Sequence, residues 1–138
     1  MIPIDAIINL GVVYKGEENL EKAIQYYTLA LQFQPNSSIA HYNLGNIYAD
    51  KEILDKSIYH HKKAIKYNPT YIKAHYNLGC VLDKVGQTTD AILSYKKALK
   101  YNPKNIKALY NLARAQLATD DYKNGWKGFE LREENTQA

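Results

Sequence analysis

The chain has 138 residues, of which 46% are hydrophobic and 23% charged, a composition typical of a soluble folded protein and not of a disordered one. Its single cysteine, Cys80, excludes an intrachain disulfide framework and favours a reducing compartment, so we expect a cytoplasmic protein. No apolar run approaches the roughly 18 residues that cross a bilayer. The net charge of +4 permits anionic partners without requiring them.

The chain repeats itself every 34 residues, as the spacing of the phrase HYNLG at His41 and again at His75 shows. Rows of this length give four repeats without an insertion: 4–37, 38–71, 72–105 and 106–132. One column of these rows holds Pro35, Pro69 and Pro103, and another holds Gly11, Gly45, Gly79 and Ala113. A fixed period of this length predicts a solenoid of stacked supersecondary units.

Each repeat predicts two helices, and the second repeat shows the pattern most clearly. A first helical stripe is followed by the polar break ADKEIL and then by a second stripe, which ends at the YNP that contains Pro69. The two stripes consist of His41, Leu44, Gly45 and Tyr48, and of Ser57, Ile58, His61, Ala64 and Ile65. In the third repeat Gly86 permits the turn between the helices, and Thr88 or Thr89 is expected to cap the next helix.

Small residues mark the places where the paired helices must approach closely. We expect Gly45 to lie against Ser57, and Gly79 against Ala91. Large residues of the second helices are expected to fill the remaining space, namely Tyr27, His61, Tyr95 and Phe129.

The columns resemble the tetratricopeptide repeat, whose 34-residue period and W-x2-L-G-x2-Y…A-x3-F…P pattern they follow closely. The resemblance covers residues 4 to about 132 and is clearest in LGVVY of the first repeat, although the usual Trp column reads Ile7, His41, His75 and Leu109. It implies an all-α, right-handed superhelical solenoid with a concave groove, made by one repeat domain over 1–132. Residues 133–138 are expected to be a disordered tail, and the implied function is non-enzymatic binding of proteins.

An asparagine recurs in the middle of every first helix, at Asn9, Asn43, Asn77 and Asn111. At about 100° per residue, Asn43 lies about 150° from the centre of its core stripe and shares a face with Asn46. Either these amides bond between neighbouring repeats, or each one pairs with the backbone of an extended peptide. We favour peptide binding, because the column is similar to the asparagine ladder of O-linked N-acetylglucosamine transferase.

Aromatic and basic residues accompany the asparagines. Tyr42, Tyr76 and Tyr110 each precede an asparagine at the flank of the core stripe, where a ring can be partly packed and partly exposed. Lys73, Lys107 and Arg114, together with Lys84 and Lys104, make the third and fourth repeats basic, with only Asp83 opposing them. This charge predicts a partner segment with acidic side chains. A carboxylate clamp for a chain terminus is not expected, because Asp5 and Asn77 stand where it needs basic residues.

Other functions receive weaker support from the sequence. It offers no spaced Cys/His set for a metal, no phosphate-binding glycine loop and no nucleophile elbow, so we expect neither an enzyme nor a cofactor. The lysines of the second helices could bind RNA or an anionic membrane, but we expect a solvated outer face and neither partner; they are Lys62, Lys63, Lys66, Lys96, Lys97 and Lys100.

The fourth repeat is atypical, because the stretch from Gly125 and Trp126 to Phe129 lies in its second helix, which stops soon afterwards. This stretch is similar to one that joins such arrays to a glycosyltransferase-like domain in some bacterial proteins. The chain could therefore be the substrate-presenting region of a larger enzyme, which a longer reading frame would show. Alternatively, its uncapped end could pair with another copy of the chain.

Overall fold

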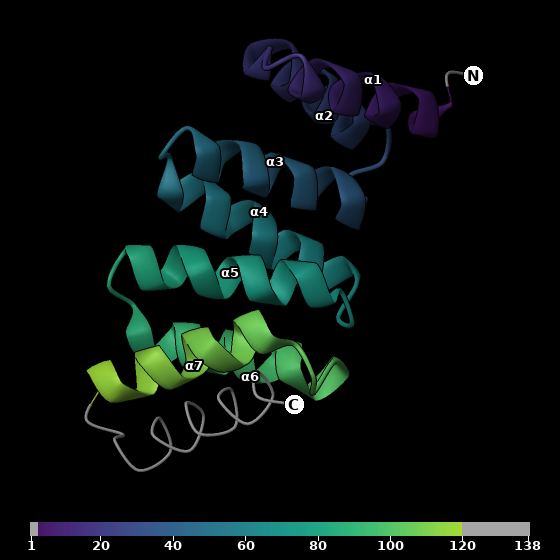
Figure 1. Ribbon diagram of the computed structural model, residues 1–138. Coiled ribbons are helices and arrows are strands. Elements are labelled where there is room, and N and C mark those ends of the chain that lie inside the picture. Colours follow the sequence, from purple (N-terminus) through teal and green to yellow (C-terminus); the bar gives the residue numbers. More distant parts are fainter. Residues whose placement is uncertain (1–2, 120–138) are drawn as a thin grey trace. The chain divides into compact units, whose positions relative to one another are not determined.

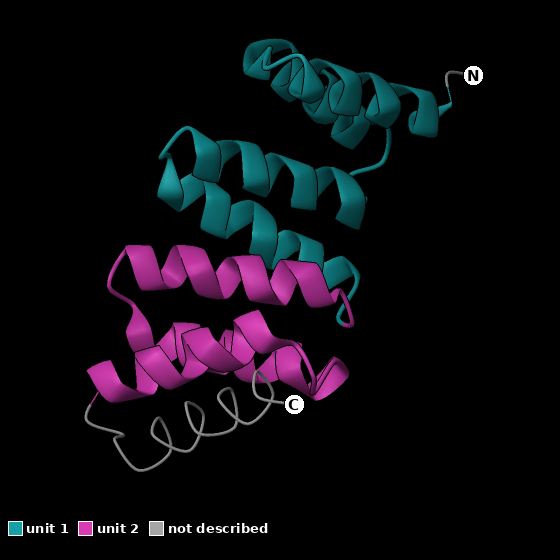
Figure 2. Ribbon diagram, viewed as in Figure 1, with its two compact units in different colours: residues 1–69 teal, residues 70–138 magenta. Residues whose placement is uncertain are grey.

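The computed structural model describes residues 3–119, which form seven α-helices (Figure 1). Their bounds are α1 Ile4–Gly16, α2 Leu20–Phe33, α3 Ser38–Asp50, α4 Leu54–Tyr67, α5 Ile72–Lys84, α6 Thr88–Tyr101 and α7 Ile106–Ala118. The chain divides into two compact units, residues 1–69 and residues 70–138 (Figure 2). Over the described residues, the expected all-α repeat architecture of paired helices is confirmed.

Unit 1 consists of two helix pairs, α1 with α2 and α3 with α4, and α2 packs on α3. Each pair turns through a residue in the left-handed region, Glu18 with φ 60° and Glu52 with φ 59°. Asn19 begins α2 by accepting a hydrogen bond from the amide of the residue three positions on, and Ser37 does the same for α3. These caps satisfy amides that the first turn of a helix otherwise leaves without partners.

The helices of each pair in unit 1 meet at a glycine of the first helix. A Cβ built on Gly11 would lie 2.7 Å from the Tyr27 ring, and one built on Gly45 would lie 2.7 Å from the His61 ring. Both rings are fully buried, as expected. The predicted contact between Gly45 and Ser57 is also confirmed, since the Ser57 hydroxyl donates to the Gly45 carbonyl at 2.7 Å.

Unit 2 repeats this arrangement in α5 and α6, and α7 packs on α6. A Cβ on Gly79 would lie 2.6 Å from the buried Tyr95 ring, and Gly86 turns the chain with φ +85° as expected. The predicted threonine cap is wrong: Thr88 is the first residue of α6, and Gln87 stands at the N-cap without a capping side-chain bond. The preceding turn fixes where the helix begins, so the threonine lies one residue too late to cap it.

The expected extent of the repeat domain, 1–132 with a tail at 133–138, stays a prediction. Phe129, the Gly125–Trp126 stretch and the expected tail lie outside the described residues.

Candidate functional site

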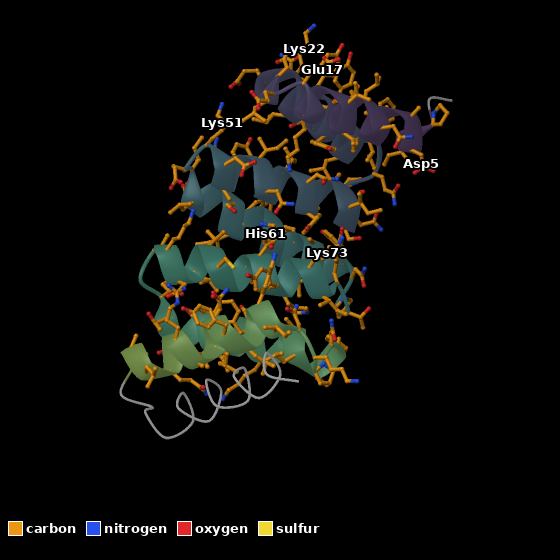
Figure 3. The ribbon with its side chains drawn as sticks, viewed as in Figure 1. Asp5, Glu17, Lys22, Lys51, His61 and Lys73 are labelled. Carbon is orange, nitrogen blue, oxygen red and sulfur yellow. The ribbon has the colours of Figure 1, made fainter. Side chains whose placement is uncertain are left out.

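The asparagines of unit 1 lie on the first helices, as the helical spacing predicts. Asn9 on α1 is exposed, whereas Asn43 and Asn46 on α3 are half-buried. Asp5 stands near the start of α1 (Figure 3), so this part of the surface carries an acidic group. The side chains that the sequence placed away from the core therefore reach the surface, but α3 exposes its amides less fully than α1 does.

In unit 2 an asparagine connects two neighbouring repeats. The Asn111 amide on α7 donates to the Tyr76 hydroxyl on α5 at 3.0 Å, and its nitrogen lies 3.9 Å from the Cys80 sulfur. Asn77 on α5 is half-buried, like Asn111. At Asn111 the amide thus makes the bond between repeats that the packing alternative requires, while its carbonyl oxygen remains a further hydrogen-bonding group.

The tyrosines beside the asparagines are half-buried, as their position at the flank of the core stripe predicts. The Tyr42 ring meets the buried His61 ring edge-on at 5.8 Å, and the Tyr76 ring lies 6.1 Å from the Tyr95 ring. Burial, followed by the nearby Cys80 thiol, raises the pKa of Tyr76, so its hydroxyl stays protonated at neutral pH. Each ring therefore contributes to packing and leaves part of its surface exposed.

The basic residues of unit 2 lie at its surface. Lys73 is exposed near the start of α5 (Figure 3), and Lys107 is exposed near the start of α7. Arg114 on α7 is also exposed and donates to the Asp83 carboxylate of α5 at 2.8 Å. A surface pair of this kind adds little stability. It does place a carboxylate against the arginine that was expected to attract an acidic partner.

A cleft of about 300 Å³ opens beside this ion pair, within unit 2. It is lined from α5, α6 and α7 by Cys80, Asp83, Lys84, Tyr95, Asn111 and Arg114. Sequence reasoning assigned Asn111 and Arg114 to the binding surface but treated Tyr95 only as packing between helices. The column of Tyr27, His61 and Tyr95 indicates burial and gives no sign that one of these rings also lines a cleft.

Three histidines of unit 1 meet between α3 and α4. His41 Nε2 lies 3.1 Å from the Pro35 carbonyl oxygen. Because a carbonyl oxygen only accepts, Nε2 carries the proton, and Nδ1 of the neutral His41 ring is an acceptor. His60 Nδ1 lies 3.0 Å from that atom and therefore donates to it. His41 is therefore a buried packing residue whose two ring nitrogens both have hydrogen-bond partners.

Burial controls the pKa values of these histidines. Loss of solvation, followed by the neighbouring histidine, lowers the pKa of His60 and of His61 to about 4. Burial also lowers the pKa of His41, against the effect of the Pro35 carbonyl. Neutral, buried rings of this kind support the helix pair, and among residues 3–119 no group of three His, Cys, Asp or Glu side chains is placed to hold a metal ion.

Several lysines of the second helices lie over tyrosine rings of the same helix. The ammonium of Lys63 is 5.6 Å from the Tyr59 ring centroid, and that of Lys100 is 5.7 Å from the Tyr101 centroid. Nearer the N-terminus, Lys51 lies at the surface of unit 1 (Figure 3). Its ammonium pairs with the carboxylate of Glu21. Such contacts within the protein stabilise several of the surface lysines without any bound anion.

None of the described helices is long and apolar enough to span a membrane.

Comparisons with known proteins agree with the repeat architecture. Sequence models described as tetratricopeptide repeat match residues 4–37 and 72–105 and residues 94–126, and one described as TPR repeat matches residues 45–86. No curated protein matches the chain by sequence.

Solved structures of MamA share the fold. One crystal structure of MamA is 25% identical, with a TM-score of 0.91 over 97% of this chain and 78% of its own. MamA from Desulfovibrio magneticus RS-1, from residue 41 to its end, is 20% identical and gives a TM-score of 0.87 over 98% of this chain and 76% of that one.

Proposed function

The chain belongs to the tetratricopeptide repeat family, and we propose that it is a non-enzymatic module that binds an extended peptide segment through the asparagine face of its first helices. The asparagine face consists of Asn9, Asn43, Asn46, Asn77 and Asn111. The repeats support a protein-binding role in general. The observation that carries the finer proposal is an asparagine at the surface in the middle of each first helix.

Asparagine destabilises a helix at these mid-helix positions unless its amide makes a compensating hydrogen bond. It lowers helix stability by roughly 0.5 kcal/mol relative to alanine at each occurrence. Asn9 is exposed, so the packing of α1 does not require it. One amide offers an acceptor and two donors, which match the N–H and C=O of a peptide backbone. A row of amides thus suits partners that share an extended backbone and differ in side chains.

The charges of unit 2 favour an acidic partner. Lys73 and Lys107 are exposed near the starts of α5 and α7, beside the helices' own asparagines. Attraction between exposed charges weakens as salt rises, since the Debye length falls from about 10 Å at 0.1 M to about 3 Å at 1 M. Binding of an acidic partner should therefore weaken as NaCl is raised, and an affinity that does not respond to salt contradicts this preference.

Affinity capture tests the proposal with wild type beside the Asn43→Ala/Asn77→Ala double variant. Proteins that bind wild type and not the double variant are ligands of the asparagine face. The matched control is Lys62→Ala/Lys96→Ala, two exposed positions on the second helices. If wild type and the asparagine variant capture the same proteins, the asparagines are structural and the proposal fails.

A further inference from the structure

The cleft of unit 2 has the features of a side-chain pocket, and we infer that it receives one carboxylate, from Asp or Glu, of the bound peptide. This assignment rests on the peptide-binding function proposed above and adds to it a location and a chemistry. The lining residues come from three helices. Two lining residues, Asn111 and Arg114, also belong to the predicted peptide-binding surface.

The size of the cleft suits a side chain. Its volume of about 300 Å³ corresponds to about ten water molecules at roughly 30 Å³ each. A carboxylate that enters would displace part of this water and would need hydrogen-bond donors in exchange. Those donors are present on two sides, from α6 and from α7.

The donor from α6 is the Tyr95 hydroxyl. Tyr95 is fully buried, and its hydroxyl lies close to the Cys80 thiol, a weak hydrogen-bonding group, without an oxygen or nitrogen partner among the described residues. A buried polar group without a partner costs about 1–3 kcal/mol. Burial, followed by the Cys80 thiol, raises the pKa of Tyr95, so the hydroxyl keeps its proton and can donate. An entering carboxylate would satisfy a group that the protein itself leaves unsatisfied.

The donors from α7 are Asn111 and Arg114. The bond from Arg114 to Asp83 uses one of the five N–H donors of a guanidinium. Asn111 uses one N–H on Tyr76 at 3.0 Å, and its contact with the Cys80 sulfur at 3.9 Å is weak. With Lys84 also in the lining, two cations oppose the single carboxylate of Asp83, which gives the cleft a net positive charge.

The repeat supplies a matched control 68 residues earlier in the chain. Tyr27 occupies the same column as Tyr95, is equally buried, and has a hydroxyl that likewise lacks an oxygen or nitrogen partner among the described residues. The positions equivalent to Cys80, Asp83, Lys84 and Arg114 are Val12, Lys15, Gly16 and Asn46. Lys15 supplies a positive charge there, but the guanidinium donors of Arg114 have no counterpart. Replacing either tyrosine by phenylalanine removes one unsatisfied hydroxyl, but only Tyr95→Phe removes a donor from the cleft.

Two labelled eight-residue Gly/Ser peptides, one with a central Glu and one with Gln, provide the test by NMR titration of the full chain. We expect the Glu peptide to bind at least fivefold more tightly than the Gln peptide. Tyr95→Phe should weaken binding of the Glu peptide about tenfold, the size expected for a hydrogen bond to a charged group. Tyr27→Phe should leave it unchanged, and Asp83→Asn should strengthen it, because Arg114 loses its competing carboxylate.

Thermal unfolding of both tyrosine variants accompanies the titration and should show them at least as stable as wild type. Equal affinity for the Glu and Gln peptides would contradict the proposed carboxylate pocket. An unchanged preference for the Glu peptide in the Tyr95→Phe variant would contradict it as well. If both peptides then still shift the resonances of Asn43 and Asn77, the proposed function stands and only the pocket fails. If neither peptide shifts any resonance, both fail.

Discussion

Lowering the pH from 7 to 5 should destabilise the protein through His61. Its ring is fully buried against Gly45, neither ring nitrogen has a hydrogen-bond partner among the described residues, and burial lowers its pKa to about 4. An unfolded chain protonates histidine near pH 6.5. The folded state therefore binds fewer protons, so its stability is complete above about pH 6.5 and falls as the pH drops toward 4.

The size of this loss follows from the two pKa values. At pH 5 His61 is almost fully protonated in the unfolded chain and almost neutral in the folded one. Proton linkage then gives a loss of about 2 kcal/mol between pH 7 and pH 5 from this residue alone. Such a loss is a large fraction of the 5–15 kcal/mol that is typical of a folded domain.

Urea unfolding at pH 7 and pH 5, followed by circular dichroism, measures the free energy of unfolding in wild type and in His61→Phe. Phenylalanine keeps a ring against Gly45 but cannot take up a proton. The variant should lose about 2 kcal/mol less than wild type over this pH interval. An equal loss in both proteins would show that His61 is not the source of the pH dependence.

Four further substitutions change the free energy of unfolding measured by the same urea assay. Gly86→Ala should lower the free energy of unfolding by about 1 kcal/mol, because φ is +85° at this residue. Gly16→Ala should raise it by about 0.5–1 kcal/mol, because the position lies in α1 with open space around it. Effects of the same sign in the two variants would contradict this contrast. Gly79→Ala should cost about 1–3 kcal/mol, since its Cβ would lie 2.6 Å from Tyr95, and a neutral result contradicts that contact. Asn9→Ala should stabilise by about 0.5 kcal/mol, and destabilisation would show a structural role.

The repeat spacing predicted that paired helices approach closely at small residues and that large rings fill the remaining space, which the described pairs show. Gly11 and Gly79 recur because the paired helices come together at that residue, and the rings of Tyr27 and Tyr95 fill the space left by the missing side chains. Because each pair has the same geometry at this point, the same residue types recur in one column, and the pairing of helices could be predicted from one sequence.

The same columns do not predict the exposure of a side chain where its surroundings differ from repeat to repeat. Leu44 is 1% exposed because α2 packs on α3, but Leu10, in the same column of α1, is 42% exposed. The cleft residue Tyr95 shows the same limit. Its column predicts a buried ring, but the cleft that Tyr95 lines is also lined by Cys80 and Arg114, and the first two repeats have Val12 and Asn46 at the equivalent positions.

Calorimetry with a partner captured by the wild-type protein tests whether the asparagine face binds it, by comparing the affinities of two variants. We expect Asn43→Ala/Asn77→Ala to weaken binding about 10- to 30-fold, at roughly 1 kcal/mol for each lost hydrogen bond. Charge reversal at Lys62, Lys63, Lys96 and Lys97 should leave the affinity unchanged. Loss of binding on charge reversal, with full affinity in the asparagine variant, would instead place the partner on the second helices.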